Sequence, residues 1–282
     1  MRVAIAGGGT GGHVIPALAV AEELRRRGHQ DILMVGTARG LEARLAPARG
    51  LRLEAIDVGA LKRAGAAQVL ATLVRLPYSL IQAARLLEEF RPDVVYGVGG
   101  YASGPVLLMA ALKEIPTVVH EPNATPGFAN RILAPFVARA LVAFPEAQRY
   151  FPATRTEVVG VPVRSRFFSV PRKEHRPPYT LLIFGGSQGS HRINGAVMES
   201  LGLFAQSGEA PLFIHQTGGK EYDEVVTAFT QSGLIRQAEI LPFIEDMPAA
   251  FARADLLVCR SGASTIAEIT AAGKAAILVP FP

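Results

Sequence analysis

Arg2-Val-Ala-Ile-Ala-Gly-Gly-Gly-Thr-Gly-Gly-His13 is the stretch that decides the fold of this chain. It opens with four apolar residues, Val3 to Ala6, which predict a buried parallel strand. Glycine fills five of the six positions from Gly7 to Gly12, and an amphipathic segment over residues 14–27 predicts a helix that ends at Gly28. This order is typical of nucleotide-binding α/β domains, because glycine lets a ligand approach the backbone and a helix start attracts phosphate. The alternative interpretation is a tight turn between strand and helix that binds no ligand.

The spacing Gly7-x-Gly9-x-x-Gly12 also fits the dinucleotide fingerprint. That fingerprint needs an acidic residue at the end of the second strand, where it holds the ribose hydroxyls. The second predicted strand, residues 31–35, has Asp31 at its wrong end and is followed by Gly36-Thr37-Ala38-Arg39. A nicotinamide cofactor is therefore disfavoured, although Arg39 is suited to bind the 2′-phosphate of such a cofactor.

Composition narrows the class of protein. A length of 282 residues with 49% hydrophobic residues fits two globular domains. The single cysteine, Cys259, lies in an apolar run, so we expect a buried structural thiol and a reducing compartment. The sequence has no apolar run of the ~18 residues that a membrane span needs. A net charge of +5 suits an anionic ligand or an anionic membrane surface, and no nucleic-acid module is evident.

Strand-like runs alternate with helix-like runs along the chain, which predicts parallel sheets covered by helices. Predicted helices include residues 41–48, 129–137 and 192–204. The predicted strands are Val3–Gly7, Ile32–Val35, Leu53–Val58, Val94–Gly97, Thr117–His120, Ala140–Ala143, Thr156–Val159, Tyr179–Phe184, Leu212–Gln216, Glu239–Leu241, Leu256–Cys259 and Ala276–Val279.

The opening unit recurs once. The strand over residues 179–184 is followed by the turn Gly185-Gly-Ser-Gln-Gly-Ser190 and a helix. We therefore predict a first domain over residues 1–162, a proline-rich linker and surface loop over 163–178, and a second domain over 179–282. Two phosphate-type turns in separate domains argue for a ligand held between them. The chain ends directly after a strand, so the second domain looks incomplete.

Polar or glycine-rich loops follow several of these strands, where doubly wound sheets bind ligands. They are Gly97 to Pro105, His120-Glu-Pro-Asn123 and Arg260 to Glu268. A helix cap explains Asn123 about as well as a ligand contact does. An ordinary buried histidine explains His120 slightly better than a functional role does. Glu268 fits a ribose ligand or a solvated helix carboxylate. Residues 60–90 form a basic amphipathic stretch, including Val69, Leu70 and Leu73, that predicts a surface helix or one lying in a lipid interface.

Six blocks together resemble the MurG family of peptidoglycan glycosyltransferases, and they occur in the family's order along the whole chain. The blocks are Ala6–His13, Gly99–Gly104, His120–Asn123, Pro162–Arg164, Gly185–Gly189 and Cys259–Glu268. The resemblance implies two Rossmann-like doubly wound α/β domains facing a cleft, the glycosyltransferase B fold. It also implies transfer of N-acetylglucosamine from UDP-N-acetylglucosamine to undecaprenyl-diphospho-N-acetylmuramyl-pentapeptide, the step from lipid I to lipid II.

The resemblance carries residue roles with it. One group would line the first-domain side of the cleft near the acceptor diphosphate and the donor sugar: Thr10, Gly11, Gly12 and His13. Asn123 would contact the sugar, and Ile244 would meet the uracil, through its backbone. Arg164, Ser187 and Gln188 would help to neutralise the donor diphosphate. A last group would hold the phosphates and ribose, with Glu268 on the hydroxyls: Ala263, Ser264, Thr265, Ile266, Ala267 and Glu268.

The resemblance further implies a peripheral enzyme on the cytoplasmic face of the cell membrane, and it favours the interfacial interpretation of residues 60–90. Two departures stand out. Pro122 occupies a position where the family usually has Gln, and the family continues past the final strand with a Gln-containing, donor-binding loop and further helices. The sequence contains no Asp-x-Asp, so we expect no bound metal and no cofactor.

For the mechanism we expect inverting displacement, in which the acceptor's C4 hydroxyl attacks the anomeric carbon. His13 is the candidate general base, because a group with a pKa near 7 suits that role, although it could instead be only a phosphate ligand. The helix near Ala263, the turn at Ser187 and Arg164 would stabilise the departing UDP. The alternatives are a UDP-N-acetylglucosamine 2-epimerase on the same fold, a non-catalytic membrane-associated UDP-sugar binder and, third, a nicotinamide oxidoreductase.

Overall fold

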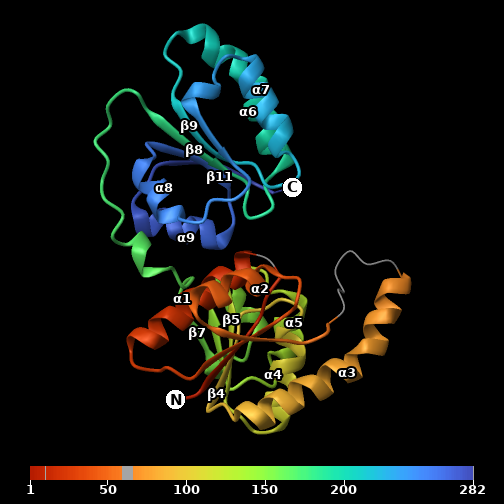
Figure 1. Cartoon of the computed structure of the whole chain (residues 1–282). Coiled ribbons are helices and arrows are strands. Elements are labelled where there is room, and N and C mark those ends of the chain that lie inside the picture. Colours follow the sequence, from red (N-terminus) through yellow and green to blue (C-terminus); the bar gives the residue numbers. More distant parts are fainter. Residues whose placement is uncertain (10, 59–65, 282) are drawn as a thin grey trace. The chain divides into compact units, whose positions relative to one another are not determined.

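The computed structural model describes residues 1–9, 11–58 and 66–281, without the side chains of residues 66–74. The chain divides into two compact units, Met1–Arg164 and Ser165–Pro282 (Figure 1). Thr10 and the basic residues Lys62 and Arg63 lie outside the described residues, as do the side chains of Val69, Leu70 and Leu73.

Unit 1 is a seven-stranded sheet in the order β3-β2-β1-β4-β5-β6-β7, with every neighbouring pair parallel. Val3 pairs with Ile32 on one side and Val94 on the other, so β1 is central. The strands are β1 (Val3–Ala6), β2 (Ile32–Gly36), β3 (Arg52–Ala55), β4 (Val94–Gly97), β5 (Thr117–Glu121), β6 (Arg139–Val142) and β7 (Thr156–Val158). The helices are α1 (Gly11–Arg26), α2 (Leu41–Leu45), α3 (Ala66–Phe90), α4 (Ser103–Leu112) and α5 (Phe128–Leu133), with 3-10 turns at Pro47–Arg49, Pro145–Tyr150 and Ala153–Arg155.

Alternation along the strands builds a core on each face of this sheet. On one face, Ala4 and Leu33 pack with buried residues of α3, α4 and α5 such as Leu87. On the other face, Ile5 and Met34 pack with buried residues of α1 and α2. Both faces are therefore covered, as an all-parallel sheet requires.

The predicted strands of unit 1 are present, and three helices differ from their predicted bounds. α1 begins at Gly11, three residues earlier than predicted, so His13 lies in its first turn. α2 ends at Leu45 because Pro47 cannot donate the next helical hydrogen bond and starts a 3-10 turn instead. α5 ends at Leu133 because Pro135 has no N–H to donate to the helix, although Ala134 still has helical backbone angles.

A buried carboxylate holds the first glycine turn. Glu42 has no exposed surface, and its side chain accepts hydrogen bonds from the backbone N–H groups of Gly9 and Thr37, both at 2.8 Å, and from the Thr37 hydroxyl. A Cβ atom at Gly8, Gly36 or Gly40 would overlap this carboxylate. These three glycines therefore form a cage around Glu42, which ties the loop after β1 to the loop after β2.

Unit 2 is a five-stranded parallel sheet in the order β10-β9-β8-β11-β12. Side chains of β8 alternate, so that Ile183 packs with α6 and α7 while Phe184 lies against Phe251 of α8. The strands are β8 (Thr180–Phe184), β9 (Leu212–Gln216), β10 (Ala238–Leu241), β11 (Leu256–Arg260) and β12 (Ala276–Val279). The helices are α6 (His191–Ser207), α7 (Tyr222–Gln231), α8 (Met247–Arg253) and α9 (Ala263–Ala272), with 3-10 turns at Ser165–Phe167 and Ile235–Gln237.

The segment over residues 165–178 packs onto unit 2. Phe167 is fully buried, with its ring edge-to-face to Phe251 at 5.0 Å between centroids. Asp255, at the start of β11, accepts hydrogen bonds from Lys173, from His175 and from the Thr180 backbone N–H at 2.7 Å. Burial raises the pKa of Asp255, but these three hydrogen bonds outweigh it and the net pKa is lowered. The carboxylate thus fixes the chain just before β8.

Two single residues complete the picture of unit 2. Cys259 is fully buried on β11, and burial raises its pKa to about 11, so the prediction of a structural thiol is confirmed. His215 on β9 is also fully buried, with Nε2 at 3.0 Å from the Asn194 side-chain oxygen. The Nδ1 atom of His215 is buried without a hydrogen-bond partner, and burial lowers the pKa of the His215 ring to about 4.

In the part of the chain that is described, no helix has the length and apolar content of a membrane span.

Gly8→Ala should destabilise unit 1 by about 2 kcal/mol, because either the Glu42 carboxylate or the turn must move and backbone N–H groups lose their acceptor. Gly104→Ala is the matched control, since its new Cβ would lie 4.0 Å from Ala129 in an ordinary contact. Urea unfolding measures both. A Gly8→Ala, Glu42→Ala double variant should lose less than the sum of the single losses, and strict additivity would contradict the cage.

The stability of unit 2 should fall between pH 6.5 and pH 4 because of His215. The unfolded chain binds a proton at a pKa near 6.5 and the folded chain only near 4, so this contribution is complete above pH 6.5 and is lost as the pH falls. Between pH 7.5 and pH 4.5 the parent chain should lose about 2 kcal/mol more than His215→Gln, measured by urea unfolding. Parallel pH curves for the two proteins would contradict this origin.

Candidate functional site

The strand order places a switch point in each sheet, where connections leave the central strand in opposite directions. In unit 1 it lies between β1 and β4, and in unit 2 between β8 and β11. Open α/β sheets bind ligands outside the carboxyl ends of the strands at such points. The two glycine turns singled out from the sequence follow β1 and β8, so both lie at a switch point.

In unit 1 the loops after β1 and β4 touch backbone to backbone. Gly100 has φ of 84°, and a Cβ there would come within 2.5 Å of the Gly8 carbonyl oxygen. His13 Nδ1 lies 2.8 Å from the carbonyl oxygen of Val98. A carbonyl can only accept, so Nδ1 carries the proton and the lone pair of the neutral ring lies on Nε2. Gly11, Gly12 and His13 form the first turn of α1 beside this contact, while Thr10 lies outside the described residues.

Asn123 is held by a buried carboxylate at the end of β5. Glu121 is 1% exposed, and one of its oxygens accepts from both the backbone N–H and the side-chain amide of Asn123, each at 2.9 Å. Its other oxygen accepts from the Gly127 N–H and the Asn130 amide. The helix-cap interpretation of Asn123 is wrong, because α5 begins after Gly127. Asn123 is exposed, which leaves its side chain accessible to a ligand.

The structure brings His13 and Asn123 into one neighbourhood. A Cβ at Gly99 would lie 3.0 Å from the His13 ring and 3.7 Å from the Asn130 amide, so Gly99 separates the two side chains. Asn130 shares the Glu121 carboxylate with Asn123.

His120 is an ordinary buried histidine, which was one of the two interpretations of this residue from the sequence. It has no exposed surface, stacks on Tyr96 at 6.3 Å between ring centroids and contacts the Gly160 carbonyl through Nε2 at 2.9 Å. Burial lowers its pKa, although the Gly160 hydrogen bond opposes that shift. The neutral ring therefore joins β5 to the loop after β7.

In unit 2, Arg260 joins the loops that leave the switch point. Its Nε donates to the Ser190 hydroxyl at 3.1 Å and its Nη1 donates to the Pro280 carbonyl oxygen at 2.6 Å. Ser190 also accepts from the Ile193 N–H and so caps α6, directly after the turn that contains Ser187 and Gln188. Sequence reasoning assigned Arg260 no role, because an arginine at the end of a strand has no distinctive signal.

The start of α9 lies where an anion is expected, at the first turn of a helix. Gly262 precedes the helix and has no side chain that could cap it. The helix opens with the predicted residues Ala263, Ser264, Thr265, Ile266 and Ala267, and the Ile266 N–H donates to the Gly262 carbonyl oxygen at 2.9 Å. One turn further, Glu268 is 8% exposed, so its interpretation as a solvated helix carboxylate is wrong. The ribose interpretation stays a prediction.

Ile244 is 7% exposed, and its backbone N–H donates to the Gln216 side-chain oxygen at 2.8 Å. The side-chain nitrogen of Gln216 donates to the Gly186 carbonyl oxygen at 2.7 Å. Gln216 therefore links the loop at Ile244 to the turn that contains Ser187 and Gln188. Sequence reasoning missed Gln216 because it appeared only as the last residue of a strand. Arg164 is the last residue of unit 1.

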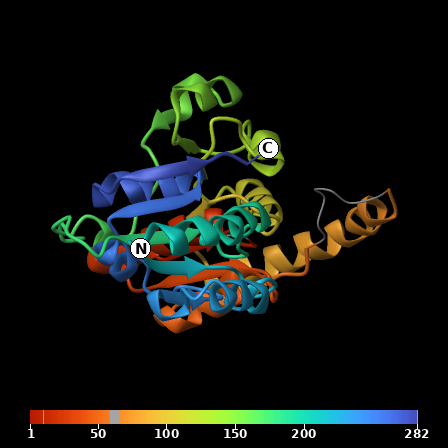
Figure 2. The same cartoon turned by 90° about the horizontal axis from the view of Figure 1, so that it is seen from above.

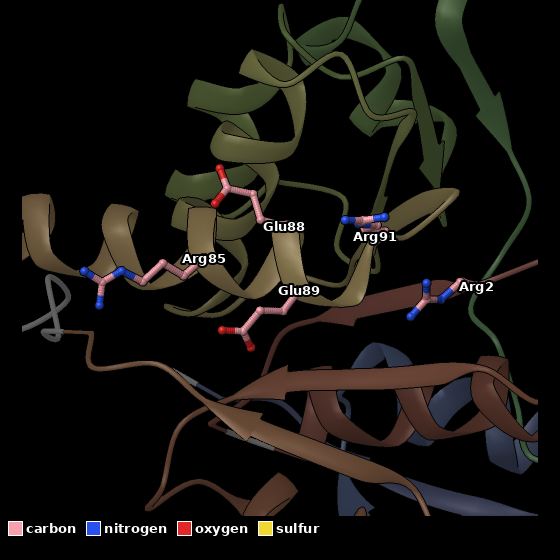
Figure 3. A pocket seen from close by; sticks show the side chains of 5 residues that line it. All are labelled: Arg2, Arg85, Glu88, Glu89 and Arg91. Atoms are coloured by element: carbon pink, nitrogen blue, oxygen red, sulfur yellow. The ribbon is translucent and has the colours of Figure 1, made fainter.

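A surface depression lies at the opposite, amino-terminal edge of the unit 1 sheet. Figure 3 shows its lining side chains, Arg2, Arg85, Glu88, Glu89 and Arg91. Arg2 lies over the Phe90 ring and Glu88 accepts from Lys113 at 2.6 Å, so these charges already have partners. Its place before β1 and β4 makes it a poor candidate for the site. No cluster of three potential metal ligands is found among the residues that are described.

Comparison with known proteins agrees with this geometry. The glycosyltransferase family 28 N-terminal domain matches residues 3–142 and the C-terminal domain of the same family matches residues 180–282. A curated UDP-N-acetylglucosamine–N-acetylmuramyl-(pentapeptide) pyrophosphoryl-undecaprenol N-acetylglucosamine transferase from Solibacter usitatus is 51% identical over 278 residues, which are 99% of this chain and 76% of that protein.

Solved structures agree on the fold. The structure of Acinetobacter baumannii MurG superposes with a TM-score of 0.71 at 34% identity and covers all of this chain and 79% of its own. A UDP-N-acetylglucosamine 2-epimerase from Rickettsia bellii has a TM-score of 0.65 at 17% identity, covering 98% of this chain and 78% of its own, and shares the fold alone. The predicted glycosyltransferase B fold is confirmed. This chain belongs to glycosyltransferase family 28 and, within it, to the MurG family of N-acetylglucosamine transferases.

Proposed function

We propose that this chain transfers N-acetylglucosamine from UDP-N-acetylglucosamine to the C4 hydroxyl of undecaprenyl-diphospho-N-acetylmuramyl-pentapeptide, with inversion at the anomeric carbon. The observation that carries the proposal is the 51% identity, over 99% of the chain, to a transferase named for this reaction. The loops that follow β1, β5, β8 and β11 support it, since each presents residues suited to such a substrate.

Donor binding is assigned to the second domain, residues 179–282. The start of α9 suits a diphosphate, because the N–H groups of a first helical turn and the helix dipole both favour negative charge there, and Gly262 has no side chain that could occupy the place. Ser187 and Gln188 would add contacts to the same diphosphate, with Arg164 supplying a cation. Glu268, one helical turn behind the amides, would hold the ribose hydroxyls.

The backbone of Ile244 would face the uracil. Its N–H already donates to Gln216, so its carbonyl oxygen is the group with capacity for the base. That carbonyl can accept only from a donor, and uracil offers its ring N–H.

Acceptor binding is assigned to the first domain, residues 1–162. His13 is the proposed general base, because the Val98 carbonyl holds the Nδ1 proton and so orients the basic Nε2. Gly11 and Gly12 would lie near the acceptor diphosphate and Asn123 near the sugar. Gly9 contributes little to an anion, since its N–H is taken by Glu42.

Membrane association is assigned to α3, placing the enzyme peripherally on the cytoplasmic face of the cell membrane. Leu76, Tyr78 and Ile81 are 40%, 55% and 50% exposed on this helix, and Arg75 and Arg85 are exposed beside them. The first part of α3 extends away from the remainder of unit 1 in both views (Figures 1 and 2). Apolar side chains with basic neighbours suit an anionic lipid surface.

The purified chain should transfer labelled N-acetylglucosamine from UDP to a short-chain analogue of the lipid-linked muramyl-pentapeptide. His13→Ala should lower kcat about 100-fold or more at saturating donor and acceptor, because a general base contributes about that much. His29→Ala, on the surface of the same unit, is the control. An unchanged kcat for His13→Ala would exclude the base role. Turnover of donor without acceptor would instead indicate an epimerase, and donor binding with no transfer would indicate a non-catalytic binder.

Leu76→Asp with Ile81→Asp should lower binding to phosphatidylglycerol vesicles about tenfold, because two exposed apolar side chains are lost and two negative charges are added. Co-sedimentation measures this. Leu203→Asp is the control, since Leu203 is 72% exposed but lies in the other unit. Equal vesicle binding by the double variant and the parent chain would exclude α3 as the docking helix.

A further inference from the structure

Gln216 links two loops, which follow the strands on either side of its own strand. It is the last residue of β9, is 2% exposed, and lies between β8 and β10 in the sheet order. Its side-chain N–H group donates to the carbonyl oxygen of Gly186, in the turn after β8. Its side-chain oxygen accepts from the Ile244 N–H, in the loop after β10.

The chemistry of the amide matches both partners. Gly186 offers a carbonyl that needs a donor, and Ile244 offers an N–H that needs an acceptor. In the opposite orientation the amide N–H group would face the Ile244 N–H and the amide oxygen would face the Gly186 carbonyl oxygen. The two partners therefore decide the orientation of the amide. An apolar replacement would leave the buried Ile244 N–H without its acceptor, which is costly, and would leave the Gly186 carbonyl with the Gly189 N–H as its donor.

The residues that follow Gln216 pack against the same turn. Gly189 has φ of 76°, and a Cβ there would overlap the Thr217 carbonyl, while a Cβ at Gly218 would overlap the Gln188 carbonyl. The turn after β8 therefore rests directly on the backbone after β9. Gln216 adds a side-chain hydrogen bond that carries this support on to the loop at Ile244.

We propose that Gln216 is a positioning residue for the nucleotide, one that sets the spacing between the loop reading the base and the turn reading the diphosphate. The inference rests on the proposed function, which places the uracil at Ile244 and the diphosphate at Ser187 and Gln188. A nucleoside diphosphate must reach both loops at once, whereas a monophosphate makes less use of the turn. Gln216 thus contributes to the preference for UDP over UMP.

The test is calorimetric titration of the chain with UDP and with UMP. Gln216→Met should weaken UDP about tenfold or more, the effect of losing one buried and one partly buried hydrogen bond, and should weaken UMP less, so that the preference for UDP shrinks. Gln216→Asn is one methylene shorter and can keep only one of the two bonds, so its effect should be intermediate. This milder variant keeps the proposal testable if Gln216→Met does not fold.

Two further variants serve as controls. Gln231→Met makes the same substitution at an exposed position of unit 2 and should change neither affinity. Glu268→Gln should weaken UDP and UMP by similar factors, because both nucleotides carry the ribose that Glu268 is proposed to hold.

The outcomes separate this inference from the proposed function. UDP binding by the parent chain, with an unchanged UDP-to-UMP preference in folded Gln216→Met and Gln216→Asn, would overturn the role of Gln216 alone. Absence of UDP binding by the parent chain would overturn the proposed donor site and this inference with it.

Discussion

Buried side chains that bind backbone amides hold the loops at the carboxyl ends of these strands. A loop that turns its backbone toward a ligand cannot satisfy all of its own N–H groups within regular structure, and an unmet buried group is costly. Glu42, Glu121 and Gln216 meet that need in three places, each nearly or fully buried. Glu42 and Gln216 have partners in a neighbouring loop, whereas Glu121 holds the loop that directly follows it. These contacts and the glycines beside them together hold the candidate site in position.

The same contacts distinguish the first glycine turn from the start of α9. In unit 1 the Gly9 N–H is bound to Glu42, whose negative charge lies directly behind the turn. Such a turn is poorly suited to hold a tightly bound diphosphate, since like charges repel in a buried setting. In unit 2 the residue before α9 is Gly262, which has no side chain that could cap the helix. This asymmetry supports donor diphosphate binding by the second unit and a catalytic role for the first.

Much of the fold could be predicted because buried parallel strands appear in a sequence as short apolar runs between turn residues. Every predicted strand is present. Two helix ends differ from their predicted bounds where a proline acts, at Pro47 and Pro135, while α1 begins three residues early and β3 ends three residues early without one. The residues at the glycine turns, together with His13, Asn123 and Glu268, could be singled out because they follow strands in the sequence. Glu42, Gln216 and Arg260 could not, since each acts on a loop distant along the chain.

The sequence by itself determined the alternation of strands and helices, the repeated glycine unit and the family, because these depend on local pattern and on order along the chain. Only the tertiary structure decided which backbone groups remain available to a ligand. It showed Asn123 bound to Glu121 rather than capping a helix, Glu268 buried rather than solvated, and the Ile244 N–H already taken. The physical reason is that strand order makes sequence-distant loops neighbours, and hydrogen bonds between such loops leave no periodic trace in the sequence.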